Sequence, residues 1–179
     1  MGLKLITPVN PEPVTLTDIK AALRVNGDTD DAMLTGHIRS AREFIERRIQ
    51  SKIGTQTWDF VIDAFPAHEI KLPFGPVQSI TSIKYDDAEG IETTVDPETY
   101  QLDNTSRRPW VFTTVGWPTP LDTFNAVRIR FVAGYDDMAM APSSLSAAIT
   151  LKTKELYDGE DTAEAVNNLL INHLDFGDV

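Results

Sequence analysis

The spacing of hydrophobic residues changes twice along this chain, and this change restricts the fold more than any other feature. Between residues 14 and 50, apolar side chains recur every three or four residues, which is typical of amphipathic helices. From Thr57 to about residue 133 the period falls to two, which indicates strands with one buried face. After Asp137 the helical spacing returns. The order of predicted elements is therefore helices, strands and helices.

Two helices are predicted in the N-terminal region. The first has Thr15 and Asp18 at the spacing of a capping box and ends before the Asn26-Gly27 turn. The second is expected to be capped by Asp28. Its apolar stripe consists of Leu34, Ile38, Ala41, Ile45 and Ile49, and the face opposite this stripe is charged.

Seven strands are predicted in the central region. In the first of them, Trp58, Phe60 and Ile62 alternate with Thr57, Asp59 and Val61, so we expect Trp58 in the core. The other strands are expected at 69–72, 79–85, 91–95, 99–102, 109–114 and 126–133. In the last strand Val127, Ile129, Phe131 and Ala133 share one face. This spacing of strands matches a compact antiparallel sandwich or barrel. Residues 72–90 read as a hairpin.

Two more helices are predicted after the strands. Pro142 suits the first position of a helix that stops near Asp158-Gly159, with Leu145, Ala148, Ile149, Lys152 and Leu156 along one face. Asp161 and Glu164 have the spacing of a capping box for a last short helix.

Helices at both ends of a chain can pack together only if the strands between them loop out. We therefore predict an α+β protein, a helical bundle formed by N- and C-terminal helices with an inserted antiparallel β subdomain. The N-terminal helical part covers residues 1–55, the β subdomain covers 56–134, and residues 135–179 supply the C-terminal helices and tail, which pack with the N-terminal helices as one domain.

The composition limits the chemistry that this chain can carry out. It has no cysteine, which removes disulfides, thiolate metal sites and cysteine nucleophiles. The apolar N-terminal stretch is short and interrupted by prolines, so we expect a soluble protein that is intracellular when made and has no membrane partner. Residues 1–55 contain eight basic and seven acidic side chains, whereas residues 135–179 contain two and nine. Such an acidic surface repels phosphate backbones, so specific DNA binding is not expected.

No catalytic or cofactor motif occurs in the sequence. The histidines His37, His68 and His173 stand far apart, and the acidic runs Asp28–Asp31 and Asp86–Glu92 lack the ligand pattern of a calcium loop. We therefore expect no enzyme activity, no cofactor and no metal. Two alternatives stay open: a carbohydrate-binding β module that uses an exposed tryptophan, and a hydrolase that uses two carboxylates.

Six segments in the same order resemble the head-tail connector (adaptor, head-completion) family of tailed bacteriophages, prophages and gene transfer agents. They are LKLITPVNPEPVTLTDIKAALRV, DDAMLTGHIRSAREFIERRI, TQTWDFVIDAFP, LPFGPVQSITSIKYDDAEG, NAVRIRFVAGYDD and APSSLSAAITLKTKELYD. The last segment of the chain, GEDTAEAVNNLLINHLDFGDV, departs from the ending that is usual in the family.

The resemblance implies a structural protein of the virion neck, assembled in the cytoplasm of the bacterial host. It implies a ring, twelve copies in number, that binds the portal protein on one side and the stopper or tail-completion protein on the other. DNA would pass through the channel of this ring without specific binding. A protein that acts by assembly needs contact surfaces rather than a reactive cleft, which agrees with the absence of catalytic motifs.

Two sets of contact residues are predicted. A short terminal helix needs a surface to cover its apolar stripe, so the portal-contact candidates are Val166, Leu169, Leu170, Leu174 and Phe176. The alternative is that this helix folds back onto its own bundle. The candidates for contact between subunits are the basic side chains Arg39, Arg42, Arg47 and Arg48, which match acidic neighbours, and Phe74, Asp86 and Asp87 in the predicted hairpin.

Overall fold

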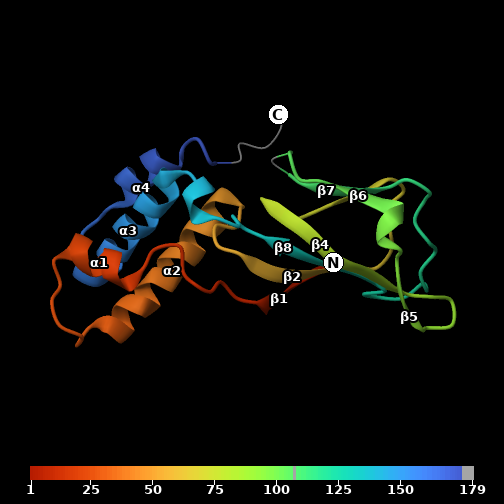
Figure 1. The fold of residues 1–179 in the computed structure, drawn as a ribbon, viewed down its shortest axis with the longest axis horizontal. Coiled ribbons are helices and arrows are strands. Elements are labelled where there is room, and N and C mark those ends of the chain that lie inside the picture. Colours follow the sequence, from red (N-terminus) through yellow and green to blue (C-terminus); the bar gives the residue numbers. More distant parts are fainter. Residues whose placement is uncertain (107, 175–179) are drawn as a thin grey trace. The chain divides into compact units, whose positions relative to one another are not determined.

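The structure is a computed structural model that describes residues 1–106 and 108–174, and it divides into two compact units (Figure 1). The β unit contains Met1–Val9 and Thr55–Asp136, and the helical unit contains residues 10–54 and the chain from Asp137 onward. The predicted α+β class is confirmed. Within the described ranges, no helix has both the length and the apolar character needed to cross a membrane.

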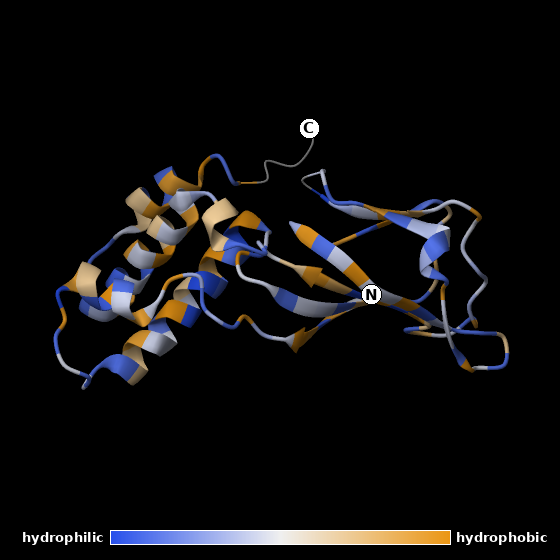
Figure 2. Ribbon diagram, in the orientation of Figure 1, coloured by the Kyte–Doolittle hydropathy of each residue, from blue (hydrophilic) through white to orange (hydrophobic). Residues whose placement is uncertain are grey.

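The helical unit is built from α1 (Leu16–Leu23), α2 (Asp31–Ile49), α3 (Ser143–Asp158) and α4 (Ala163–Leu170). α2 packs against α3, α3 packs against α4, and α1 contacts both α2 and α3. The predicted stripe of α2 is confirmed, since all five of its residues are buried. They form a core with Ile19, Leu145, Ala148, Ile149, Val166 and Leu170. Hydrophobic and hydrophilic bands alternate along these helices, as Figure 2 shows.

The helix ends confirm some of the predicted caps and correct others. Thr15 and Asp18 form the predicted capping box of α1. The N-cap of α2 is Asp30 rather than Asp28, so the helix starts two residues later than expected. The predicted box at Asp161 is wrong, because α4 is preceded by Thr162, which makes no side-chain cap bond. The Asp161 carboxylate instead accepts a hydrogen bond from the Ala163 N–H at 2.9 Å. Leu156 is exposed, not part of the buried face of α3.

The β unit contains two antiparallel sheets. The five-stranded sheet has the order β1 (Gly2–Thr7), β2 (Gln56–Ile62), β8 (Val127–Ala133), β4 (Val77–Asp86) and β5 (Glu92–Thr94). The three-stranded sheet has the order β3 (Glu69–Lys71), β7 (Trp110–Thr113) and β6 (Tyr100–Asp103). Two short 3₁₀ helices, Pro97–Thr99 and Met138–Met140, lie before β6 and α3.

Inward side chains of both sheets form one core. β8 supplies four of them with the predicted alternation, and Trp58 packs against this cluster as expected. The fully or nearly fully buried members include Phe60, Ile62, Ile70, Ile83, Val111, Val127, Ile129, Phe131 and Ala133.

Two features of the β unit differ from the sequence analysis. β1 was not predicted, because its alternation of Leu3 and Leu5 with Lys4 is too short to stand out; it pairs with β2 at the sheet edge. The predicted hairpin at 72–90 is wrong. β3 pairs with β7, whereas β4 pairs with β8 and β5, so residues 72–76 carry the chain from one sheet to the other.

We predict that Ile45→Ala destabilises the protein by about 2–5 kcal/mol, because Ile45 is fully buried in the stripe of α2 and its truncation leaves a cavity. Met33→Ala on the exposed side of the same helix should change stability by no more than about 0.5 kcal/mol. Urea unfolding of both variants checks this. Equal effects of the two substitutions would contradict the assigned burial.

Candidate assembly surfaces

A buried ion network fixes the inner side of α2. Arg42 Nε donates to Glu12 Oε2 at 2.7 Å, and Arg42 Nη1 donates to Glu46 Oε2 at 3.2 Å. The second oxygen of Glu46 accepts a hydrogen bond from the Ile53 N–H at 2.9 Å. Burial lowers the pKa of Arg42, but the hydrogen bond to Glu12 and the charge of Glu46 outweigh it and raise that pKa. The network therefore ties the segments before α1 and after α2 to the middle of α2.

This network changes the role of one predicted contact residue. Arg42 is only 5% exposed and its guanidinium is occupied within its own chain, so it is not available to a neighbouring subunit. Arg39, Arg47 and Arg48 are exposed on α2, as predicted. Arg39 lies 4.0 Å from Glu12, whereas the side chains of Arg47 and Arg48 have no ion-pair partner among the residues that the structure describes.

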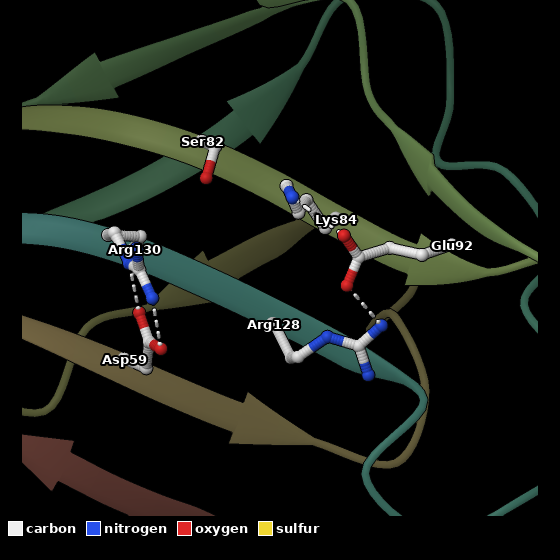
Figure 3. Close-up of a pocket in the computed structure, with 6 residues that line it drawn as sticks. All are labelled: Asp59, Ser82, Lys84, Glu92, Arg128 and Arg130. Atoms are coloured by element: carbon white, nitrogen blue, oxygen red, sulfur yellow. Dashed lines mark hydrogen bonds and ion pairs between the residues drawn. The ribbon is translucent and has the colours of Figure 1, made fainter.

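A second polar cluster covers the outer face of the five-stranded sheet (Figure 3). Arg130 on β8 lies directly opposite Asp59 on β2 and binds it with two hydrogen bonds of 2.7 and 2.8 Å. Arg128 on β8 lies opposite Lys84 on β4, and like charges at such positions repel. Glu92 on β5 resolves this conflict, because one of its oxygens accepts from Lys84 at 2.6 Å and the other from Arg128 at 3.0 Å.

The same cluster fixes the end of β4. Arg128 Nη2 donates to Asp86 Oδ1 at 2.5 Å, and this hydrogen bond lowers the pKa of Asp86. The pKa of Glu92 is lowered chiefly by the hydrogen bond from Lys84, with a further contribution from Arg128. A shallow pocket on this face is lined by Ser82 and by the charged side chains of Asp59, Lys84, Glu92, Arg128 and Arg130. Every charge there is compensated by a neighbour on the sheet.

The other predicted contact residues of the β unit also have partners within their chain. Phe74 packs on the core beside Trp58 and Phe131, with ring centroids 5.3 and 5.5 Å away. Asp87 accepts hydrogen bonds from the N–H groups of Glu89 and Ile91 and so shapes the turn between β4 and β5. Phe74, Asp86 and Asp87 thus hold the β unit together, and whether they also contact a neighbouring subunit stays a prediction.

The C-terminal candidates divide into two groups. Val166 and Leu170 are buried within the helical unit, where α4 packs against α3. Leu169 and Leu174 are half-buried, and Phe176 lies outside the described residues. The Ser144 hydroxyl and the His173 ring nitrogen Nε2 are 2.9 Å apart, which holds the chain after α4 against the start of α3. Folding back onto the helical unit therefore accounts for Val166 and Leu170.

The tryptophans that could stack on a sugar are engaged inside the chain. Trp117 donates from Nε1 to the His68 carbonyl at 2.7 Å, and its ring is stacked on Phe65 at 5.0 Å. Trp110 is half-buried and lies 5.6 Å from the ring of Phe112. Between residues 1 and 174, position 107 apart, no three His, Asp or Glu side chains are grouped so that they could hold a metal ion.

Comparison with known proteins identifies the class to which these surfaces belong. The sequence profile of the phage gp6-like head-tail connector protein family matches residues 13–108, more than half of the chain. The chain therefore belongs to this family and has a structural role as a head-tail connector. No curated protein sequence matches it significantly.

Three solved structures have the same fold over the whole chain. A chain from the neck of an empty gene transfer agent (GTA) particle computed with C6 symmetry superposes with a TM-score of 0.85 at 22% identity. A chain from the virion of a native GTA particle gives 0.82 at 24%, and one from the neck of a native particle computed with C12 symmetry gives 0.78 at 23%. Each match covers 100% of this chain and 98% of the other.

The outer-face cluster predicts how stability depends on pH. The pKa values of Asp86 and Glu92 are lower in the folded than in the unfolded chain, so their stabilising effect is complete above the unfolded values, about 4. It is lost as the pH falls through the folded values. We expect Arg128→Met to lower the melting temperature at pH 7 and to flatten its decline below pH ~4.

Circular dichroism melting between neutral and acidic pH measures this effect. Lys71→Met is the matched control, because it also removes one positive charge, and the ammonium of Lys71 is highly exposed and 3.9 Å from Glu69. If Arg128→Met and Lys71→Met follow the same pH profile, the cluster does not contribute to acid sensitivity.

Proposed function

We propose that this protein forms a ring with copies of itself in the neck of a tailed phage or phage-like particle. The ring would join the portal protein to a stopper or tail-completion protein and leave a channel for DNA. The family match carries the proposal, since it spans both the helices α1 and α2 and much of the β unit. The similar chains from GTA necks computed with C6 and C12 symmetry support a ring and a place in the neck.

The two compact units also support a proposal for the domain organisation of the chain. In this proposal α1 and α2 from the N-terminal part and α3 and α4 from the C-terminal part form one helical domain. The stretch Thr55–Asp136 is inserted into it, and Met1–Val9 add β1 to the β unit from before α1. The net charge of −11 would keep DNA from adhering to the ring, because like charges repel. Binding would therefore not slow the passage of DNA through the channel.

We propose that the exposed basic side chains of α2 contribute to the contact between copies. Arg39, Arg47 and Arg48 are exposed on α2. The middle part of the chain, residues 56–134, holds eleven acidic and six basic side chains, and the segment from residue 135 onward holds nine and two. An adjacent copy in the ring would present acidic side chains of these two parts. Such a contact between exposed charges favours correct pairing and weakens as salt screens it.

Charge reversal tests this contact. Arg47→Glu should leave the melting temperature nearly unchanged, because its side chain is exposed, and should reduce ring formation on the purified portal protein of the same particle in a salt-dependent way. Lys71→Glu in the β unit is the control with the same change of net charge. Negative-stain electron microscopy and sedimentation detect the ring. Equal ring formation by both variants would show that the basic face is only a solvated surface.

We propose further that the C-terminal segment contacts the portal through Leu169, Leu174 and Phe176, while Val166 and Leu170 anchor α4 on its own unit. A segment anchored in this way could present further apolar side chains to a partner. Removing the whole segment from residue 160 should therefore also destabilise the fold, since burying one such side chain contributes about 1.5–3 kcal/mol.

Two truncations separate anchoring from docking. Removing residues 171–179 keeps both buried anchors, so the shortened protein should stay folded but bind the purified portal at least about tenfold more weakly, a loss of roughly 1.4 kcal/mol. Removing residues 160–179 should lower the melting temperature as well. Thermal melting and sedimentation with portal measure the two effects. Portal binding that is unchanged after removal of 171–179 would refute the docking role.

A further inference from the structure

One end of the β unit carries an exposed apolar cluster, called here the apolar tip and made of Ile91, Leu121 and Phe124. Phe124 is 86% exposed and Ile91 is 63% exposed. Backbone hydrogen bonds join the loop that carries Leu121 and Phe124 to the end of β4, just before the turn that carries Ile91. The Leu121 N–H donates to the Asp86 carbonyl at 2.8 Å, and the Asp86 N–H donates to the Ala126 carbonyl at 2.9 Å. The loop with Phe124 therefore lies beside the turn between β4 and β5.

The loop that presents Phe124 is held in a defined conformation. Asn125 has a positive φ of 61°, and its N–H donates to Asp63 Oδ1 at 2.9 Å. Phe124 contributes little to the core at this exposure. Together with Ile91 and Leu121 it gives this end of the β unit an exposed apolar patch, which is the kind of feature that marks a contact with another molecule. Glu89 and Asp122 flank the tip, and within the described part of the chain their carboxylates have no ion-pair partner. The tip is thus apolar with an acidic rim.

The helical unit has a hollow with the opposite rim. α2, α3 and α4 form it together, and Phe44, Ala163 and Val166 supply its apolar lining. Its charged lining consists of Arg48 on α2 and of the ion pair Lys152–Glu155 on α3, so Arg48 makes the hollow basic on balance. Lys152 Nζ lies 4.5 Å from the centroid of the Phe44 ring, and it is also paired with Glu155. The guanidinium of Arg48 has no partner among the described side chains, so it is free to bind an acidic group.

We infer that the apolar tip of one copy docks into the hollow of the next copy. The occupant is a second copy of this chain, because an acidic-rimmed apolar knob and a basic-rimmed apolar hollow occur on the same polypeptide. Phe124 would contact Phe44, and Asp122 would pair with Arg48. Two different surfaces make a head-to-tail contact, which generates a closed ring when the rotation between copies closes. The inference rests on the proposed ring and names residues of its interface.

Disulfide trapping tests the contact directly, because the natural chain has no cysteine. The variant Phe124→Cys with Asn167→Cys, where Asn167 also lines the hollow, should give a ladder of covalent oligomers when oxidised at high protein concentration. The control pairs Val115→Cys with Asn167→Cys, since Val115 is 74% exposed in the β unit but lies outside the tip. Equal ladders from both pairs, or a ladder from neither, would overturn the inference.

A charge exchange provides a second measurement without oxidation. Asp122→Lys and Arg48→Glu should each weaken self-association by about tenfold, and the double variant should recover most of that loss. Sedimentation of all three beside the wild type measures the effect. Suppose that the wild type forms rings but the cysteine pair gives no disulfide ladder and the double charge variant recovers no association. That outcome would refute this contact and leave the proposed ring in place. A wild type that forms no ring, alone or on portal, would refute both the proposed function and this contact.

Discussion

The β unit depends on the central strand β8, which pairs with β2 on one side and β4 on the other. Its alternation places Val127, Ile129, Phe131 and Ala133 in the core, where none is accessible to solvent. The same alternation places Arg128 and Arg130 on the outer face. A shift of one residue in pairing would exchange these two sets and bury both guanidinium groups. One strand thus fixes the register of its neighbours, the core between the two sheets and the position of the surface charges.

The helical unit combines apolar packing with a directional polar network. The stripe of α2 is buried, and the bonds of Arg42 to Glu12 and Glu46 in addition require particular atoms to meet. Breaking such a buried pair leaves an uncompensated charge, which costs about 3–5 kcal/mol. The network therefore orients the segments that enter and leave α2, and with them the exposed arginines on its outer side.

The surfaces that remain free are those that suit assembly. Charges on the outer face of the sheet are paired with one another. Within the β unit Phe65 is stacked on Trp117, and Phe74 meets Trp58 edge-on. Among the described residues, Arg47 and Arg48 on α2 and the acidic-rimmed apolar tip around Phe124 are exposed and lack ion-pair or core partners. A head-tail connector is a structural protein, and exposed charged and apolar surfaces on both units suit such a role.

The sequence by itself determined the local elements. The two changes of hydrophobic period predicted the α+β class, the stripe of α2, the inward face of β8 and the capping box at Thr15, because each depends on residues within a few positions of one another. It also supported the family, through short segments in a fixed order. Tertiary structure decided which strands pair. The expected hairpin at 72–90 became a link between sheets, and β1 joined β2 although both α1 and α2 lie between them in the chain. It decided likewise that Arg42 is buried and that Asp59 and Glu92 hold the arginines of β8. These contacts join residues far apart in the chain, and their partners depend on strand register and helix packing that no local pattern encodes.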